Sequence, residues 1–193
     1  MNYMDDRVIP GNMPILALRG LTVFPKQVVH FEVGRKKSMK AIERAMNDDN
    51  MILLMPQKDI TTDDPSLSEL CTIGTVARIK QVLKGQNNTI RVLAEGEYRA
   101  RVINLTQSEP FMNGQVAEIP DTEITDSPQN QALCRRAYVL YSRYLEISDS
   151  SLQSVQLRLL SSNDPGFVAD TIAQNSSLDY LDKVKLLANL HQF

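Results

Sequence analysis

The chain has 193 residues, of which 42% are hydrophobic and 23% charged, and its formal net charge is -2 at pH 7. This composition is typical of a globular chain with a buried core, and the charge argues against a dedicated nucleic-acid binder, which usually carries a strong basic excess. No run approaches the roughly eighteen apolar residues of a membrane span, and no secretory signal is visible, so we expect no membrane partner. Two cysteines outside any CxxC pattern favour the cytoplasm.

The first part of the chain predicts a strand, a turn, a second strand and a helix. Residues 1–13 are polar, so we expect a disordered tail there. A strand should start at Pro14 and end before a Phe24-Pro25 turn. Alternating side chains predict the next strand over residues 28–33. After Gly34, apolar residues recur at helical spacing as far as Met46, which indicates an amphipathic helix.

Short strands dominate the chain as far as residue 119. The apolar run at residues 51–55 is typical of a strand covered on both faces. Asp64 is predicted to cap a short helix that starts at Pro65. Residues 74–84 and 89–94 should form a hairpin around residues 85–88, followed by a bulge at Gly96. Strands at 97–103 and 114–119 complete the set, with Tyr98 and Arg99 on opposite faces. Closing such a sheet into a barrel would remove its exposed edges.

The pattern changes to helices after a polar linker at residues 121–131. Ser127, the Asn163-Asp164-Pro165 segment and Ser177 are predicted to cap three of four helices. The first of these helices should bury a stripe of five residues: Leu133, Ala137, Leu140, Tyr141 and Tyr144. We therefore predict an α+β chain in which a β-rich barrel with one prominent helix (14–120) is followed by an antiparallel helical bundle (121–193).

The sequence contains no motif for catalysis, cofactors or metals. It has no phosphate-binding P-loop, no dinucleotide fingerprint, no HExxH zinc motif and no nucleophile motif such as G-x-S-x-G. We therefore name no catalytic, cofactor-binding or metal-binding residue. A function carried by surface contacts with a partner is the remaining expectation.

Two groups of residues are candidates for such a partner surface. The first is a basic cluster around the start of the first helix, where the helix dipole disfavours positive charge. It comprises Lys26, Arg35, Lys36, Lys37 and Lys40, and the last four of these are the candidate binding residues. The second is apolar and lies at predicted turns and helix ends: Phe24, Pro25, Met46, Phe111 and Met112. The alternative for the basic group is an ordinary solvated face, and for the apolar group it is the core.

Ordered blocks along the chain resemble the N-terminal domain of the Lon family of ATP-dependent serine proteases. The pattern P-x-L-x-L-R…F-P matches residues 14–25, and V-G-R-x-K-S followed by x-A-x-E-x-A-M matches residues 33–46. Q-K-D at 57–59, I-G-T-V-A-R-I at 73–79, V-L-A-E-G-E-Y-R-A-R-V at 92–102 and D-P-x-x-x-A-D-x-I-A at 164–173 also match. The resemblance covers residues 14–190, and as an ordered set the blocks are highly specific.

The resemblance implies a PUA-like pseudo-barrel and a non-catalytic role. In the family, the ATPase and the Ser-Lys peptidase follow this region and need ATP and Mg²⁺, so this fragment is not expected to be an enzyme itself. Its expected partners are unfolded or damaged polypeptides and other subunits of a hexamer, with the fragment alone a monomer or weak dimer. The expected role is substrate recognition and oligomer assembly in protein quality control. The alternative is a free-standing Lon-like module that binds a protein partner or RNA.

Overall fold

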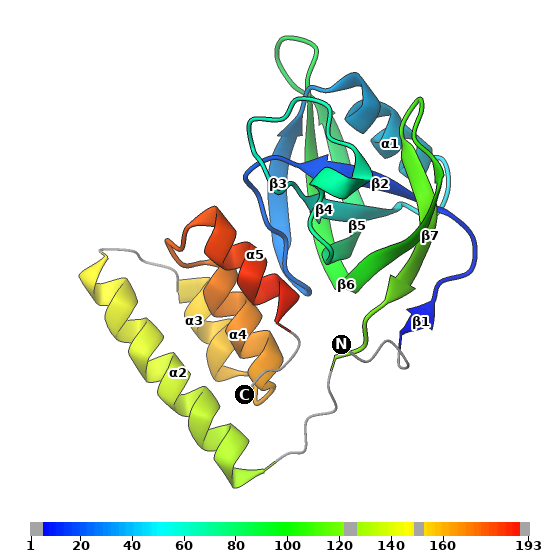
Figure 1. Cartoon of the computed structure of the whole chain (residues 1–193). Coiled ribbons are helices and arrows are strands. Elements are labelled where there is room, and N and C mark those ends of the chain that lie inside the picture. Colours follow the sequence, from blue (N-terminus) through cyan, green and yellow to red (C-terminus); the bar gives the residue numbers. More distant parts are fainter. Residues whose placement is uncertain (1–5, 122–126, 149–152, 190–193) are drawn as a thin grey trace.

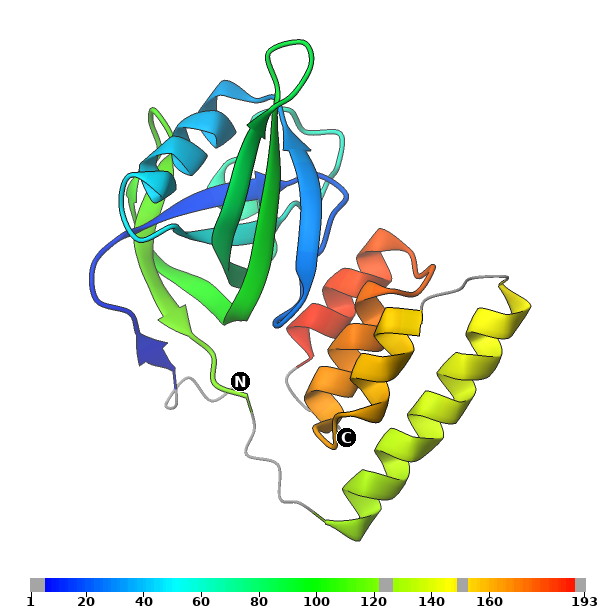
Figure 2. The same ribbon diagram turned by 180° about the vertical axis from the view of Figure 1, so that it is seen from behind.

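The computed structural model describes residues 6–121, 127–148 and 153–189. The strands gather in one half of the molecule, and helices α2 to α5 form the other (Figure 1). Seen from behind, α1 lies against the strand half, away from the other helices (Figure 2). No helix in the described ranges is long and apolar enough to cross a membrane. The strands are β1 (Arg7–Val8), β2 (Met13–Leu18), β3 (Val28–Val33), β4 (Met51–Pro56), β5 (Gly74–Lys84), β6 (Ile90–Gln107) and β7 (Met112–Glu118). The helices are α1 (Lys36–Met46), the short 3-10 helix η2 (Leu67–Glu69), α2 (Pro128–Ile147), α3 (Gln153–Leu160), α4 (Pro165–Gln174) and α5 (Tyr180–Ala188).

The seven strands form one sheet that closes on itself. Their order is β1-β7-β2-β4-β5-β6-β3, and β6 also pairs with β7. Strands β2, β4, β5, β6 and β7 therefore make a closed ring, with β1 and β3 attached outside it. Among the strands of the described ranges, only β2 and β4 pair in parallel, and α1 lies in the connection between them. Closure removes free edges from the ring, as the sequence had led us to expect.

The expected tail over residues 1–13 is wrong for the part of it that the structure describes. Arg7 and Val8 form β1, which pairs antiparallel with Glu118 and Ala117 of β7, and β2 already begins at Met13. The ladder gives the polar backbone of this segment its hydrogen-bond partners, which composition alone does not reveal. Residues 1–5 lie outside the described residues.

Gly96 lies at a bulge in a single long strand, where the sequence had predicted two strands. Strand β6 runs continuously from Ile90 to Gln107, and its register against β5 shifts between Val76 and Ala77, opposite Gly96. A side-chain carbon at Gly96 would lie 2.3 Å from the carbonyl oxygen of Phe24. Glycine is therefore required here because a neighbouring backbone approaches too closely for any side chain.

Two apolar clusters share the strands β2 and β4. On one face, Leu16, Ile52 and Leu54 pack with Ala41 and Ile42 of α1 and with residues of β3. On the other face, a cluster inside the ring combines Ile15, Ala17, Leu53, Met55, Val76 and Met112. All six residues of β4 are buried, which explains why this strand is continuously apolar rather than alternating.

The helical half follows the sequence prediction in its elements and departs from it in detail. Ser127 and Asp164 cap α2 and α4 as predicted, each accepting hydrogen bonds from backbone N–H groups of the first turn. Asp179, not Ser177, precedes α5, and Ser66, not Asp64, caps η2. In α2 the buried residues are Cys134, Tyr141 and Leu145, whereas the predicted Leu133 and Leu140 are 39% and 55% exposed. The buried stripe of α2 is narrow because, in the described part of the chain, this helix packs mainly against α3 and α4 on one side.

A polar junction joins the two halves. Arg99 of β6 is only 6% exposed and binds Asp170 of α4 with two hydrogen bonds of 2.9 and 2.6 Å, while its Nε donates to the carbonyl oxygen of Leu187 at 3.0 Å. Gln27 donates to the Thr171 hydroxyl at 2.9 Å. Around these polar contacts lies an apolar cluster that consists of Phe24, Ile73, Ile119, Ala173 and Leu187. The halves are thus held together by buried charge pairing as well as by apolar packing.

Candidate functional site

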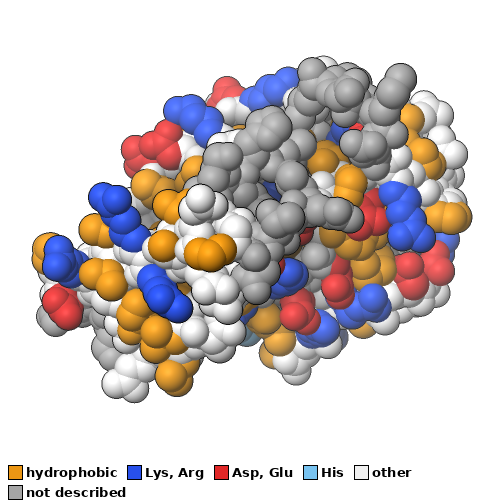
Figure 3. Space-filling view, turned by 90° about the horizontal axis from the view of Figure 1, so that it is seen from below, with side chains coloured by type: hydrophobic (Ala, Val, Ile, Leu, Met, Phe, Trp, Pro, Cys, Tyr) orange, Lys and Arg blue, Asp and Glu red, His pale blue; other side chains and the backbone are white. Residues whose placement is uncertain are grey.

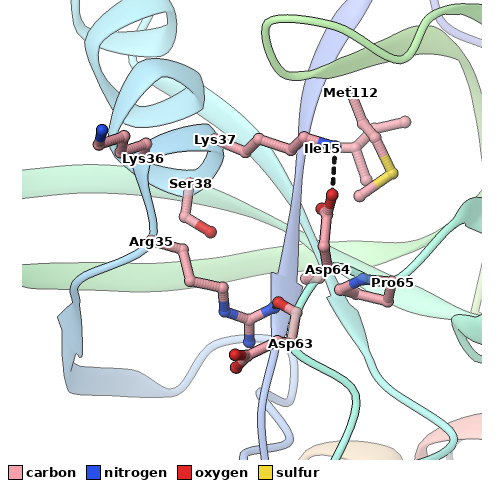
Figure 4. A pocket seen from close by; sticks show the side chains of 10 residues that line it. Ile15, Arg35, Lys36, Lys37, Ser38, Asp63, Asp64, Pro65 and Met112 are labelled. Carbon is pink, nitrogen blue, oxygen red and sulfur yellow. Dashed lines mark hydrogen bonds and ion pairs between the residues drawn. The ribbon is translucent and has the colours of Figure 1, made fainter.

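A cavity of about 290 Å³ lies between β2, the first turn of α1, the loop before η2 and the start of β7 (Figure 4). Segments from distant parts of the sequence meet here because β2 has β4 on one side and β7 on the other. Its floor is apolar and its rim carries both signs of charge. The lining residues are Ile15, Ala17, Arg35, Lys36, Lys37, Ser38, Asp63, Asp64, Pro65 and Met112.

Arg35 and the buried Gln57 hold the loop wall of this cavity. The Arg35 guanidinium donates to Gln57 Oε1 at 2.6 Å and to the carbonyl oxygen of Asp63 at 3.1 Å. Gln57 in turn donates from Nε2 to the carbonyl oxygens of Asp59 and Thr62 at 3.2 and 3.0 Å. Burial, and then the nearby charge of Arg19, lower the pKa of Arg35. The amide therefore fixes the loop, and the guanidinium ties the loop to α1.

Lys37 bridges the opposite side of the rim. Its ammonium lies 2.7 Å from both Asp64 Oδ2 and Glu109 Oε1, and the hydrogen bonds to these carboxylates raise the pKa of Lys37. Both acidic side chains are well exposed, so these ion pairs close the rim loosely rather than lock it. The dashed line in Figure 4 marks the contact with Asp64.

The structure brings together some of the residues predicted as a partner surface and separates others. Arg35, Lys36, Lys37 and Met112 line the cavity. Lys40 and Met46 are exposed further along α1, outside the cavity lining, and Phe111 is half-buried against the core. Phe24 and Pro25 are buried and cannot form a surface, so the prediction for these two is wrong. Helices α4 and α5 cover Phe24 with Ala173 and Leu187, a contact that local sequence does not encode.

Sequence reasoning missed the residues that complete the cavity. Asp64 and Pro65 were predicted only as the cap and first residue of a short helix, Asp63 was not singled out as a site residue, and Ser38 was noted only as part of a motif. The local sequence gives one signal for this site. Ser38, between Lys37 and Met39, is a polar residue on the buried face of α1, which is otherwise apolar. The pairing of the loop with α1 depends on tertiary contacts through Gln57.

Exposed apolar side chains gather on the helical half and make a second candidate surface. Figure 3 looks at this end of the molecule and shows orange apolar side chains interleaved with blue basic ones. Ile147 is 87% exposed at the end of α2, seven residues after Leu140. We call these exposed side chains together the apolar helical surface; they are spread over several helices and comprise Leu133, Val139, Leu140 and Ile147 of α2, Leu157 and Leu160 of α3, Leu178 before α5, and Leu181 and Leu186 of α5. Exposed apolar groups in this concentration mark interaction sites on soluble domains.

The described residues contain no arrangement typical of catalysis by a metal or a thiol. No group of three His, Cys, Asp or Glu side chains in the described ranges is placed to hold a metal ion. Cys71 and Cys134 are unpaired, and burial raises the pKa of both thiols, which disfavours the reactive thiolate. Fold and surface together define a binding domain, built of a closed sheet and several helices.

Comparison with known proteins places this binding domain in a family. Residues 12–192 match the sequence model of the ATP-dependent protease La (LON) substrate-binding domain, and the chain belongs to this family. It is 36% identical over 188 residues to Lon protease from Brevibacillus choshinensis, covering 97% of this chain and 24% of that protein. It is 37% identical to Lon protease 1 from Bacillus subtilis strain 168 and 36% identical to Lon protease from Escherichia coli strain K12, in each case over 91% of this chain. The chain spans 24%, 23% and 22% of the length of these three relatives.

Solved structures share the fold. The N-terminal domain of Mycobacterium avium complex Lon protease superposes with a TM-score of 0.76 at 23% identity, covering 94% of this chain and 92% of that one. The Lon N-terminal domain protein from Xanthomonas campestris gives a TM-score of 0.65 at 14% identity, with the same coverage. The resemblance read from the sequence motifs is therefore confirmed, and so is the mixed α+β class with a large sheet and several helices.

Proposed function

We propose that this chain is the non-catalytic substrate-capturing domain of an ATP-dependent Lon-type protease and binds unfolded or damaged polypeptides. Membership in the substrate-binding family supports the role in binding. The architecture we assign is a PUA-like pseudo-barrel followed by an antiparallel helical bundle. ATP hydrolysis and peptide-bond cleavage would belong to the regions of its relatives that this chain does not span.

The apolar helical surface is the observation that carries this proposal. Unfolded polypeptides differ from folded ones mainly by their exposed apolar side chains. When an exposed apolar surface of this domain covers those side chains, both are removed from water and the free energy falls. Basic residues such as Arg135, Arg136 and Arg143 lie between the apolar ones along α2 and keep the surface hydrated. A surface of separate apolar side chains, rather than one shaped pocket, suits ligands of many sequences.

Several copies of this domain would make weak capture effective. In a hexamer, six such surfaces would face the same polypeptide, and multivalency raises an overall affinity by roughly 10² to 10⁴. We propose that the domain also aids subunit assembly, that the assembled enzyme serves protein quality control, and that it acts in the cytoplasm.

The experiment that tests this function is fluorescence anisotropy of a labelled, permanently unfolded protein titrated with this chain. We expect saturable binding without nucleotide, and weaker binding by about tenfold or more when Leu133, Leu140 and Ile147 are all replaced by serine, because each contributes buried apolar area in the complex. The matched control replaces Val8, Val28 and Leu83 of the strand half, which are 53–55% exposed. Equal loss in both variants, or binding only to a single-stranded RNA control, would contradict the proposal.

A further inference from the structure

The first turn of α1 has the features of an anion site but no anion from its own chain. The first turn contains no acidic residue, and the N-cap residue Arg35 makes no side-chain capping hydrogen bond. The first amide that bonds within the helix is that of Met39, to the carbonyl oxygen of Arg35 at 2.9 Å. The amides of Lys36, Lys37 and Ser38 precede it and are left for another acceptor. Helix dipole and amides together favour a negative group here.

Ser38 gives independent evidence that a ligand belongs in this cavity. Its side chain is among the buried polar groups, with an exposed fraction of 8%, and its hydroxyl has no hydrogen-bond partner among the described residues. Figure 4 shows this hydroxyl pointing into the space between Arg35 and Lys37. The hydroxyl opens onto the cavity, so its hydrogen-bond partner comes from whatever occupies that space, a bound group or water.

The charges of the rim limit what that group is. Arg35 is held by Gln57, and Lys37 is shared by Asp64 and Glu109, whereas Lys36 makes no ion pair within the described part of the chain. One positive charge is thus left beside the helix N-terminus. Asp63 and Asp64 form the facing wall and would repel a ligand with several negative charges. The site fits a ligand with one negative charge.

The floor of the cavity adds an apolar requirement. Ile15, Ala17, Pro65 and Met112 lie within the same volume of about 290 Å³ as the anion site. A peptide's final residue carries its carboxylate and its side chain on one Cα, so both fit a cavity of this size together. An Asp or Glu side chain inside a chain would instead bring flanking backbone that the small cavity does not accommodate.

We propose that this cavity binds the free C-terminal carboxylate of a substrate polypeptide whose last residue is apolar. The carboxylate accepts hydrogen bonds from the Ser38 hydroxyl and the amides of the first turn of α1, as in other sites that capture chain termini. The last side chain packs on Ile15 and Met112. This inference rests on the proposed function, because it assumes that the ligand is a polypeptide, and it adds the part of the polypeptide that is recognised.

The experiment compares short N-terminally labelled peptides of one sequence in an anisotropy titration with the full chain. One peptide ends in leucine with a free carboxylate, one ends in leucine amide, and one ends in serine with a free carboxylate. We expect the free leucine acid to bind at least about tenfold more tightly than the other two, because charged hydrogen bonds and apolar burial are both needed. Equal binding of acid and amide would overturn the proposal, and equal binding of leucine and serine acids would overturn its apolar part.

Matched variants separate ligand binding from folding. Ser38→Ala removes the hydroxyl without leaving a new unpaired group, so the fold should persist while the preference for the acid falls severalfold or more. Its control is the same substitution at Ser142 in α2, Ser142→Ala, which removes a serine hydroxyl without a partner far from the cavity. Lys36→Glu should abolish the preference, whereas Lys40→Glu, with the same charge change one turn further along α1 and outside the cavity, should leave it intact. Equal effects within either pair would overturn the proposal.

An unfolded protein with an amidated C-terminus distinguishes failure of this inference from failure of the proposed function. If the blocked protein binds and the peptides show no preference for the free acid, the C-terminal site is refuted and the proposed function stands. Absence of binding by the blocked protein, together with a clear preference for the leucine acid, refutes capture by the apolar helical surface and supports the C-terminal site.

Discussion

Replacing Arg99 by methionine should destabilise the chain strongly at neutral pH. The change keeps the length and apolar stem of the side chain and removes three hydrogen bonds, two to Asp170 and one to the carbonyl oxygen of Leu187. The carboxylate of Asp170, whose side chain is 10% exposed, then loses the only ion-pair partner that it has among the described residues. A buried charge that loses its partner is among the costliest single changes in a protein.

The magnitude follows from the two ways in which Asp170 can respond. It can stay charged and buried, at a cost of about 3–5 kcal/mol. It can instead take up a proton, which at pH 7 costs about 4 kcal/mol for a carboxyl whose ordinary pKa is 3.8. The two limits agree, so we expect the free energy of unfolding to fall by about 4 kcal/mol.

The pH dependence supplies a second check. Burial raises the pKa of Asp170 above its ordinary value, and the Arg99 guanidinium offsets only part of that rise. Because the folded pKa is raised, stability from this carboxyl is present below its unfolded pKa and lost as the pH rises through the folded pKa. Without Arg99 that pKa rises further, so the deficit of the variant should shrink as the pH falls from 7 to about 4.

The assay is urea unfolding followed by far-ultraviolet circular dichroism. The matched control, Arg91→Met, changes an exposed arginine of the same strand and should shift the free energy by no more than about 0.5 kcal/mol. The double variant Arg99→Met, Asp170→Leu should recover most of the loss, because a buried ion pair and an apolar pair of similar size are close in stability. A loss below about 1 kcal/mol for Arg99→Met, or a deficit that does not shrink on acidification, would refute this account of the junction.

Two further predictions concern the same junction. Phe24→Ser should lower the free energy of unfolding by about 3–5 kcal/mol, since the side chain is fully buried; a folded variant of unchanged stability in urea would contradict its core position. Burial raises the pKa of Tyr180 to about 12, and its hydroxyl donates to the carbonyl oxygen of Gln57 at 2.7 Å. In an alkaline titration followed by tyrosinate absorbance, Tyr180→Phe should remove the last tyrosine to ionise, and an unchanged titration curve would contradict this assignment. Because the folded pKa is raised, the unsubstituted protein should lose the stability that this group contributes as the pH rises above the ordinary pKa of 10.

Most elements of the fold were readable from local patterns. The alternation of Val29, Phe31 and Val33 predicts β3, and the apolar run at Met51 predicts a strand buried on both faces; both are observed. Two of the helix starts follow from a capping residue before proline, at Ser127 and Asp164. These signals are local because backbone hydrogen bonding and side-chain period act over a few residues.

The candidate site was only partly readable. The basic residues Arg35, Lys36 and Lys37 were noticed because their charge opposes the helix dipole. In the structure these residues face Asp63, Asp64 and the apolar floor of the cavity. This arrangement depends on β7 and the loop before η2, which are brought to α1 by contacts between residues more than twenty positions apart in sequence. No periodicity in α1 encodes those neighbours.

The sequence by itself determined the order and type of most elements, the absence of any catalytic motif and the family to which the chain belongs. Tertiary structure alone decided which side chains are inside and which are left for partners. Arg99 has the pattern of an outward residue and is buried because α4 brings Asp170 to it. Leu140 has the pattern of a core residue and is exposed because no element in the described ranges covers that side of α2. A side chain is buried only when a second surface covers it, and the sequence of one segment does not specify which surface will do so.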